Sequence, residues 1–266
     1  MSVEITNAVA ADAPQPIRAE TVIVLPCFNE EQRLQPQIFL DFLRREPQIA
    51  LLFIDDGSSD GTQQLLQELK QAAPSNRVDV VSLPRNQGKA EAVRQGLLRA
   101  LAAKPVFVGY WDADLATPLA VSAHFRQLLT QNSNLNLVMG SRVQLLGRTI
   151  DRKIWRHYTG RVFATLVSLM LKLRVYDTQC GAKLFRASAE LAKILELPFL
   201  ARWVFDVEIL ARMQHEHRRT GGQPLEQRVF EYPLEYWRDV EGSKLRTGDF
   251  FIAFRDLIQI YLRYVD

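Results

Sequence analysis

The chain has 266 residues, with 33 Lys and Arg against 30 Asp and Glu and a net charge of +3. Hydrophobic residues make up 47 % and charged residues 24 %, with only 13 Gly and 12 Pro, which excludes disordered, collagen-like and low-complexity chains. A chain of this length buries about 75 % of its unfolded surface, enough for one large domain with appendages. The nearly balanced charge gives no reason to expect nucleic acid as a partner.

Neither the N-terminus nor the cysteines indicate an exported or zinc-binding protein. Residues 1–20 contain prolines and acids but no apolar signal-peptide core, so we expect a flexible leader. The longest uncharged apolar run, Val162–Leu171, has ten residues, whereas a membrane-spanning helix needs roughly 20. Cys27 and Cys180 belong to no Cys-x-x-Cys or Cys/His pattern, and two thiols make no disulfide framework. Reduced cysteines in a cytoplasmic protein are the simplest interpretation.

One segment carries most of the positive charge. Residues 141–175 hold eight basic residues against one acid, a net charge of +7, so the rest of the chain carries −4. A strongly basic segment on a mildly acidic body favours a local anionic partner, such as a phosphate or a membrane surface. A basic helix face that is merely solvated is the alternative.

The first 140 residues alternate short apolar, β-branched runs with longer amphipathic stretches. The runs predict strands at Thr21–Leu25, Ala50–Ile54, Val78–Ser82, Val106–Trp111 and Leu135–Met139. The stretches between them predict helices near Glu31–Arg45, Gly61–Ala73, Lys89–Ala103 and Pro118–Gln131. Strands separated by helices of this length form βαβ units, so we expect an α/β fold with a mostly parallel central sheet covered on both faces. Ligands of such sheets bind beyond the carboxyl ends of the strands.

The second half has a different pattern. A basic amphipathic stretch at 150–175 is followed by a Cys-Gly turn, a helix predicted at Val204–His217, a strand-like run at Arg228–Tyr236 and a C-terminal amphipathic helix over 249–266. The last helix has a wide apolar stripe, made by Phe250, Phe251, Phe254, Leu257, Ile258, Tyr261 and Leu262. Such a stripe is more typical of core packing than of membrane contact. We expect a single domain over 21–248, with the C-terminal helix appended.

Two carboxylates stand just past the strand expected to be central. Alternate strand residues face the same way, so Asp112 and Asp114 could address one hard cation that holds a diphosphate. An Asp-x-Asp pair alone is common in loops, but Glu30, Asp55 and Asp56 follow earlier strands and could accept hydrogen bonds from a ribose and a base. Each strand end could by itself be a helix cap or a turn. Their recurrence at successive strand ends favours one site.

These motifs, in this order, resemble those of glycosyltransferase family 2, which has the GT-A type of fold. The motifs are Pro26-x-Phe28-Asn29-Glu30, Ile54-Asp55-Asp56-Gly57-Ser58-x-Asp60-Gly61-Thr62, Asn86-x-Gly88-Lys89 and Asp112-x-Asp114. Later segments are similar to dolichyl-phosphate β-glucosyltransferases, namely 140–142, 177–185, 202–208 and 242–244. The resemblance covers about Thr21 to Lys244 and implies a nucleotide-sugar donor, an Mg²⁺ or Mn²⁺ ion, and a polyprenyl or dolichyl phosphate acceptor.

The resemblance also implies roles for individual residues. The donor would be bound by Pro26, Phe28, Glu30, Ile54, Asp56, Lys89, Asp112 and Ala113. Asp112 and Asp114 would bind the metal ion and the diphosphate. The acceptor and phosphates would be met by Arg142, Arg152, Arg156, Arg238 and Lys244. Related dolichyl-phosphate mannosyltransferases have a Gln metal ligand where this chain has Ala116, so the coordination must be completed differently and the glucosyl interpretation gains support.

The acceptor determines the expected mechanism. A phosphate monoester has a second pKa of about 6, so at pH 7 it is already a dianionic nucleophile that hardly needs a general base. Positioning and charge neutralisation should dominate, which predicts a single in-line displacement that inverts an α-linked donor to a β-linked product. Asp206 and Glu208 are candidates to orient sugar hydroxyls or act as a base. Helix capping or a salt bridge is the alternative for both.

The basic stretch fits a helix lying in a membrane interface. Arg148, Arg152 and Arg156 line one face. Apolar residues recur every four positions on another, at Ile150, Ile154, Tyr158, Val162, Leu166 and Met170. Docking of this stripe on the sheet is the alternative. We expect a cytoplasmic protein associated peripherally with the cytoplasmic face of a membrane.

Other functions fit the motifs less well. A haloacid dehalogenase phosphatase has its Asp-x-Asp at the first strand, with Thr or Val where this chain has Ala116. A nucleotidylyltransferase needs a Gly-rich N-terminal loop and a dinucleotide-binding dehydrogenase needs GxGxxG, and the sequence has neither. The alternatives kept open are transfer of mannose from GDP-mannose in place of glucose from UDP-glucose, and a non-catalytic sugar-nucleotide-binding subunit. The intact Asp112, Asp114, Arg142 and Lys244 argue against the latter.

Overall fold

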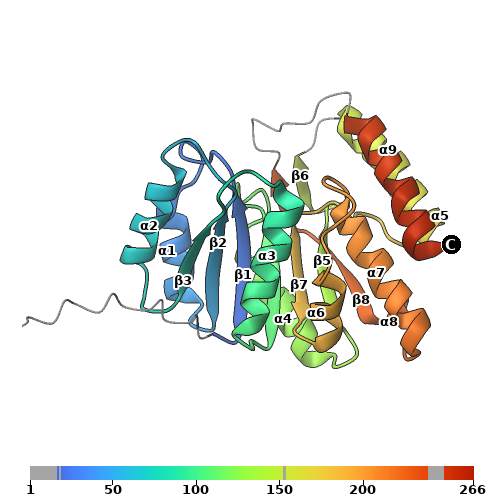
Figure 1. The fold of residues 1–266 in the computed structure, drawn as a ribbon, viewed down its shortest axis with the longest axis horizontal. Coiled ribbons are helices and arrows are strands. Elements are labelled where there is room, and N and C mark those ends of the chain that lie inside the picture. The colour runs from blue at the N-terminus through green and yellow to red at the C-terminus, as the bar shows by residue number, and fades with distance from the viewer. Residues whose placement is uncertain (1–16, 18, 152–153, 239–248) are drawn as a thin grey trace, which may run out of the picture.

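A sheet of seven strands lies between two layers of helices, in the spatial order β3-β2-β1-β4-β7-β5-β8 (Figure 1). The structure is a computed structural model and describes residues 17, 19–151, 154–238 and 249–266. The strands of this sheet are β1 Thr21–Cys27, β2 Ile49–Asp55, β3 Val78–Ser82, β4 Phe107–Trp111, β5 Leu137–Ser141, β7 Ala182–Arg186 and β8 Val229–Pro233. A separate parallel pair joins β6 Thr149–Asp151 to β9 Tyr236–Arg238.

The helices connect and cover these strands. They are α1 Pro36–Arg45, α2 Thr62–Ala72, α3 Lys89–Ala102, α4 Val121–Gln131, α5 Ile154–Leu171, α6 Ala189–Leu195, α7 Phe205–Thr220, α8 Leu225–Arg228 and α9 Asp249–Ile260, continued by a π-helical turn at Tyr261–Val265. Helix α1 begins five residues later than predicted, because Pro36 takes the first helical turn, where its missing N–H costs nothing. The other helices predicted in the first half begin and end within three residues of their expected positions.

Strands β1 to β4 form the predicted parallel half of the sheet. Every residue of β2 is buried, and β1 has only Pro26 partly exposed, as expected for strands covered on both faces. Helices α3, α6 and α7 cover one face, and α1, α2 and α4 pack on the other, which gives two apolar clusters. Strand β4 holds the fourth of seven places, which confirms the prediction that the strand before Asp112 is central.

Strand β7 departs from the sequence prediction. The sequence Lys183-Leu184-Phe185-Arg186 was not expected to be a strand, yet β7 lies between β4 and β5 and runs antiparallel to both. Its insertion brings the preceding turn next to the end of β4, where the backbone N–H of Asp112 donates to the carbonyl of Gly181 at 2.8 Å. The region after the central strand is therefore built from two distant parts of the chain.

Helix α5 has apolar residues on two faces. Ala164, Val167 and Leu171 are buried against the core, whereas Val162, Leu166 and Leu169 are exposed. One side of the helix therefore packs on the protein, and apolar side chains remain exposed on another side; contact with a membrane stays a prediction. Ile150, predicted to lie on the same helix, belongs instead to β6.

The C-terminal helix differs from its prediction as a core element. Helix α9 lies at the same end of the molecule as α5 (Figure 1); α9 contacts α7, and the π-helical turn that continues α9 contacts both α5 and α7. Leu257 and Ile260 are buried, but Phe254, Ile258 and Leu262 of the predicted stripe are exposed. The stripe is wider than the contact with the protein, so only one edge of it enters the core. No described helix combines the length and the hydropathy that a membrane crossing requires.

Candidate active site

The Asp-x-Asp pair lies at the end of β4 and meets a lysine from α3. The Nζ of Lys89, the first residue of that helix, is 2.5 Å from Oδ1 of Asp112. Their side chains are 42 % and 31 % exposed, so the pair can be reached by a ligand. Burial lowers the pKa of Lys89, but the charges of Asp112 and Asp206 outweigh it and the net pKa is raised. The ammonium group therefore stays charged at neutral pH.

Asp114 supplies the second carboxylate. Its Oδ1 accepts from the N–H of Ala116 at 3.0 Å. Burial and the neighbouring charge of Asp112 raise the pKa of Asp114, which is the response of a carboxylate crowded by another. A divalent cation would relieve this repulsion, and carboxylate oxygens are ligands that Mg²⁺ and Mn²⁺ accept. The pair thus fits the metal implied by the sequence.

The rest of such a coordination shell would come from outside the side chains described. Within residues 17, 19–151, 154–238 and 249–266, no three His, Cys, Asp or Glu side chains gather as a metal site. Mg²⁺ commonly binds through one or two carboxylates together with substrate phosphates and water. Gly181 packs directly against this carboxylate, because a Cβ there would stand 2.0 Å from Oδ2 of Asp112.

Asp56 holds the loop that leads to Lys89. Its two carboxylate oxygens accept from the backbone N–H groups of Gln87 at 2.7 Å and Gly88 at 2.8 Å. Gly88 has φ +94, a conformation that favours glycine, and immediately precedes α3. Burial raises the pKa of Asp56, against the effect of these two hydrogen bonds. The carboxylate proposed to meet the nucleoside therefore already positions the start of α3.

The other predicted donor residues differ in their accessibility. Glu30 forms an ion pair with Arg33 at 2.6 Å, at the same edge of the sheet. Pro26 and Phe28 are partly exposed there, whereas Ala113 is buried. Ile54 is 1 % exposed and packs towards Gly96 of α3, where a Cβ would meet its Cγ1 at 2.9 Å. The Ile54 side chain therefore lies in the core, so that any contact with the donor would come from its backbone; its predicted role stays a prediction.

Asp206 belongs to a buried polar cluster. Lys183 Nζ lies 2.5 Å from its Oδ1, and the hydroxyl of Tyr110 donates to the same oxygen. Burial first, and then the charge of Asp206, raise the pKa of Tyr110 far above its usual range. Glu208, the other candidate base, is fully buried and pairs with Arg212 at 2.6 Å. Both carboxylates are thus engaged as salt-bridge partners, the alternative that the sequence left open.

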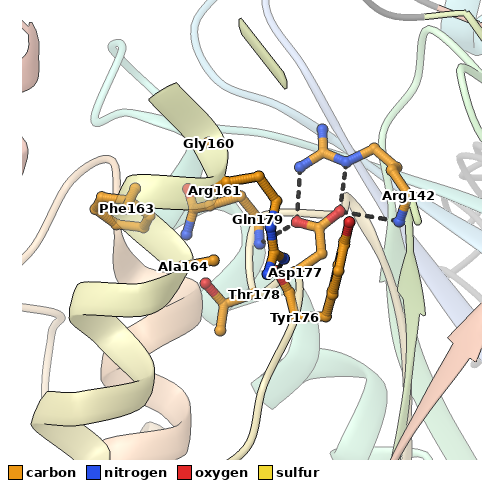
Figure 2. Close-up of a pocket in the computed structure, with 9 residues that line it drawn as sticks. All are labelled: Arg142, Gly160, Arg161, Phe163, Ala164, Tyr176, Asp177, Thr178 and Gln179. Carbon is orange, nitrogen blue, oxygen red and sulfur yellow. Dashed lines mark hydrogen bonds and ion pairs between the residues drawn. The ribbon is translucent and has the colours of Figure 1, made fainter. Parts of the chain in front are cut away.

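Arg142, at the end of β5, lies on the other side of the 177–181 turn. Its Nε and Nη2 donate to the carboxylate of Asp177 at 2.6 and 2.8 Å, and its backbone N–H donates at 3.0 Å (Figure 2). The guanidinium also lies 5.3 Å from the ring centre of Trp237. Burial lowers the pKa of Arg142, but the charge of Asp177 more than compensates and the net pKa is raised.

A small pocket opens beside this pair. It has a volume of about 40 Å³, and its lining includes Arg142, Arg161, Tyr176, Asp177 and Gln179 (Figure 2). Arg161 comes from α5 and lies 3.6 Å above the ring of Tyr176. Two guanidinium groups from different elements therefore border one cavity, which suits an anion such as a phosphate.

Of the remaining predicted acceptor residues, only the side chain of Arg238 is described by the structure. Arg238 follows Trp237 in β9, is 71 % exposed on its side chain, and lies 4.0 Å from Asp151. Its backbone N–H donates to the carbonyl of Ala116 at 3.4 Å, which puts β9 next to the Asp-x-Asp turn. Arg152 and Lys244 lie outside the described residues, as does the side chain of Arg156.

Sequence reasoning missed three residues of this region. In the sequence, Arg161 is one of eight basic residues in the segment 141–175, with nothing to distinguish it from the others, and Asp177 is one residue of a longer motif. Glu231 stood in a strand-like run and carried no signal of its own, although its carboxylate accepts from the N–H groups of Tyr176 and Asp177. The clustering of basic residues around Arg142 is the signal that could have found Arg161.

The sheet order is that of a GT-A-like fold, and the family match shows that the chain is a glycosyltransferase. Residues 22–191 match the family described as glycosyl transferase family 2, and the chain belongs to that family. The resemblance inferred from the motifs is thereby confirmed, as is the predicted fold class.

Relatives that match more than nine tenths of the chain carry one recurring name. The chain is 30 % identical over 261 residues to dolichyl-phosphate beta-glucosyltransferase of Homo sapiens, which covers 91 % of this chain and 75 % of the relative. It is 30 % identical to the protein of that name from Drosophila melanogaster, with 92 % and 76 % covered. The protein of the same name from Dictyostelium discoideum is 29 % identical, with 91 % and 74 % covered.

Solved structures share the fold at lower identity. Glucosyl-3-phosphoglycerate synthase from Mycobacterium tuberculosis, in complex with UDP, superposes with a TM-score of 0.60 at 19 % identity, covering 91 % of this chain and 79 % of that one. A complex of the same enzyme with Mn²⁺, UDP and glucosyl-3-phosphoglycerate gives 0.55 at 22 % identity, with 91 % and 78 % covered. TarS residues 1–349 of S. aureus with UDP gives 0.55 at 16 % identity, with 92 % and 66 % covered.

Proposed function

We propose that the chain transfers glucose from UDP-glucose to a polyprenyl or dolichyl phosphate, with a divalent metal ion and with inversion at the anomeric carbon. One observation carries the proposal: the carboxylates of Asp112 and Asp114 and the arginine pocket of Arg142 flank a single turn, residues 177–181. A metal-held diphosphate and an anionic acceptor can therefore meet across that turn. The names of the relatives support dolichyl phosphate as the acceptor and glucose as the sugar.

UDP is the proposed nucleotide, for two reasons. The M. tuberculosis enzyme with the same fold has been solved with UDP, and also with Mn²⁺ and UDP-glucose. In addition, Ala116 stands where the mannosyltransferases that the motifs resemble have a metal-binding Gln. Pro26, Phe28 and Glu30, which are partly exposed at the β1 edge of the sheet, would contact the nucleoside together with Asp56.

The chain's own residues would act by position and charge. A divalent ion bound by Asp112 and Asp114 would act as a Lewis acid towards the departing nucleoside diphosphate. Lys89 places a second positive charge beside the same phosphates. Arg142, already fixed by Asp177, presents its remaining N–H groups to the acceptor phosphate and reduces its repulsion from the donor. The dianionic acceptor attacks without a base, consistent with Asp206 and Glu208 being engaged in buried pairs.

We further propose that the protein binds peripherally to the cytoplasmic face of a membrane through α5 and α9. Val162, Leu166 and Leu169 of α5 are exposed, as are Phe254 and Ile258 of α9 and Leu262 of the π-helical turn that continues it. Exposed apolar residues clustered on adjacent helices are typical of an interaction surface. This end of the molecule also carries the arginine pocket, so a lipid in the membrane could reach it with its phosphate.

Labelled UDP-glucose and GDP-mannose offered separately with polyprenyl phosphate test the proposal. We expect lipid-linked product from UDP-glucose, lost on addition of EDTA and restored by Mn²⁺ or Mg²⁺. Product from GDP-mannose alone would overturn the donor assignment, and undiminished product in EDTA would overturn the metal requirement. Lipid product from neither donor would refute the acceptor class.

A further inference from the structure

The turn between the two halves of the site fixes their separation. At one end Asp177 binds Arg142, and at the other the carbonyl of Gly181 accepts from the N–H of Asp112. Four residues of fully extended chain span at most about 14 Å, so the path from Asp177 to Gly181 is short. The position of this turn therefore determines how far the acceptor arginine stands from the donor carboxylates.

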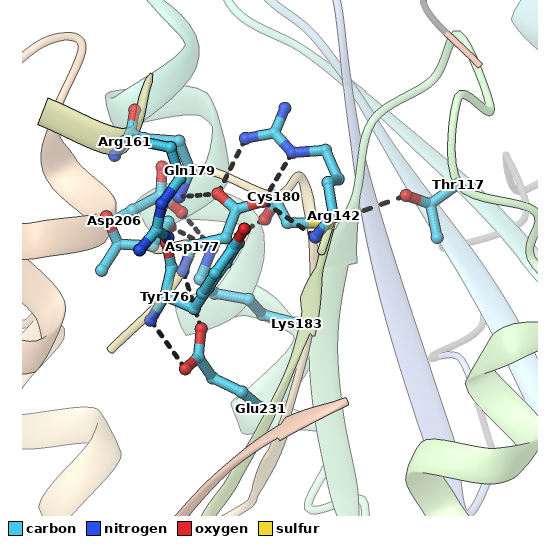
Figure 3. Close-up of polar contacts among 11 residues, drawn as sticks. Thr117, Arg142, Arg161, Tyr176, Asp177, Gln179, Cys180, Lys183, Asp206 and Glu231 are labelled. Carbon is cyan, nitrogen blue, oxygen red and sulfur yellow. Dashed lines mark hydrogen bonds and ion pairs between the residues drawn. The ribbon is translucent and has the colours of Figure 1, made fainter. Parts of the chain in front are cut away.

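Two buried or partly buried side chains hold the backbone of the turn (Figure 3). Lys183 of β7 donates to the carbonyls of Thr178 at 2.9 Å and Cys180 at 2.8 Å. Glu231 of β8 accepts from the N–H of Tyr176 on Oε2 and from the N–H of Asp177 on Oε1, both at 2.8 Å. Hydrogen bonds that involve a charged group are about twice as strong as neutral ones. Lys183 thus anchors the donor end of the turn, and Glu231 anchors the acceptor end.

Glu231 is well placed to act on Arg142 without touching the acceptor. Strand β8 pairs with β5, with Glu231 opposite Met139. The strand that carries Glu231 therefore lies against the strand that immediately precedes Arg142. Glu231 does not line the pocket that Arg142 and Arg161 border. Burial raises the pKa of Glu231, and the two backbone hydrogen bonds act in the opposite direction.

We propose that Glu231 is a positioning residue for sugar transfer, which fixes the backbone at Tyr176–Asp177 and, through the Asp177 carboxylate, orients Arg142 towards the acceptor phosphate. This inference rests on the proposed function, because it takes a phosphate-bearing lipid as the acceptor. It assigns Glu231 to the acceptor half of the site and not to the binding of the nucleotide.

The variant Glu231→Gln tests the role at nearly constant size. The amide keeps one acceptor oxygen but turns an NH₂ group towards one of the two backbone N–H groups, so the turn must shift. We expect kcat/KM for polyprenyl phosphate to fall about 10- to 100-fold, chiefly through a higher KM, because small misplacements of a binding group carry costs of this size. Binding of UDP in the presence of Mn²⁺, measured by calorimetry, should change less than about twofold.

A double-mutant cycle separates positioning from general stability. In the Arg142→Ala background, we expect Glu231→Gln to lower kcat/KM for polyprenyl phosphate by less than about a further twofold, because the effect of Glu231 passes through Arg142. Glu231→Asp keeps the carboxylate but shortens the side chain by one methylene group, so we expect a fall in kcat/KM that is smaller than that of Glu231→Gln. Glu216→Gln is the matched control: this glutamate pairs with Lys193 at 2.5 Å near the end of α7, away from the turn, and its loss should leave kcat/KM unchanged.

Several outcomes would overturn the inference. If the double variant lowers kcat/KM by the product of the two single effects, Glu231 acts independently of Arg142. An equal loss of UDP affinity, or failure of both Glu231 variants to fold, would assign the residue to the scaffold. A wild-type chain that makes no lipid-linked sugar would refute the proposed function and this inference with it, whereas an active wild type with multiplying variants would refute the inference alone.

Discussion

At the scale of single residues, the charged side chains of the site form ion pairs with one another. Asp112 meets Lys89, Asp177 meets Arg142, and Asp206 meets Lys183. Only the first pair is substantially exposed, which makes it the one that a donor diphosphate can enter. The fully buried pair of Lys183 and Asp206 instead secures the turn between donor and acceptor.

Asp114→Asn tests the carboxylate pair. The change preserves shape but removes a charge from the proposed metal site, so we expect kcat to fall about 100-fold or more and the Mn²⁺ concentration for half-maximal rate to rise. The measurement is the initial rate of lipid glucosylation over a Mn²⁺ titration. Asp41→Asn, which removes an exposed aspartate that pairs with Arg44 on α1, should leave both quantities unchanged. A wild-type Mn²⁺ response in Asp114→Asn would exclude Asp114 as a ligand.

At the scale of elements, α5 is a helix with an inner and an outer apolar face. Leu171 is fully buried, whereas Leu169, two residues earlier, is 71 % exposed. We therefore expect Leu171→Ala to lower the free energy of unfolding by about 2–5 kcal/mol, through lost burial and the cavity left behind. Leu169→Ala should change it by less than about 0.5 kcal/mol. Urea denaturation of both variants provides the measurement, and equal effects would contradict the two-faced arrangement.

The outer face should matter for membranes and not for folding. The triple variant Leu166→Glu, Leu169→Glu and Ile258→Glu places charges on the exposed surface of α5 and α9, so co-sedimentation with vesicles should fall at least about tenfold, since burying a charge at an apolar interface is costly. Ile38→Glu is the matched control, because Ile38 is 44 % exposed on α1. Unchanged co-sedimentation of the triple variant would exclude this surface.

The sequence predicts a helix or strand well where a local periodic pattern or motif specifies it, and poorly where long-range pairing stabilises it. The strands and helices before Ser141 follow from periodicity, and the Asp-x-Asp turn follows from adjoining motifs; apart from the later start of α1, these elements lie within three residues of their predicted positions. Strand β7 was missed because its five residues carry two cations, and it is stabilised by pairing with β4 and β5 and not by its own pattern. The same holds for Glu231, whose partners Tyr176 and Asp177 are 55 and 54 residues away. Residues that are this far apart in the chain form no local sequence pattern from which their contact could be predicted.

At the scale of the whole molecule, the small net charge of +3 is the sum of an acidic part and a basic part that lie in different regions of the chain. The donor carboxylates lie in the first half of the chain, and the basic segment 141–175 supplies Arg142, Arg161 and helix α5. The antiparallel strand β7 joins the two halves, because the turn before it contacts both Asp112 and Arg142. In the proposed function, this arrangement places the donor carboxylates next to the arginines that would meet an anionic lipid.

The localised charge predicts salt-sensitive membrane binding. The Debye length falls to about 3 Å at 1 M salt, so binding to vesicles that contain anionic lipid should weaken severalfold there, while binding to neutral vesicles should persist. Arg152→Glu/Arg156→Glu should produce the same loss at low salt. Salt-independent binding to anionic vesicles would show that the basic segment does not face the lipid headgroups.

The central claim is that a lipid phosphate held by Arg142 attacks the donor directly, in one displacement. The anomeric configuration of the product, determined by NMR after incubation with UDP-glucose, polyprenyl phosphate and Mn²⁺, tests it most directly. We predict a β-linked glucosyl phosphate, inverted from the α-linked donor. An α-linked product would contradict the single displacement and would require a nucleophile on the protein.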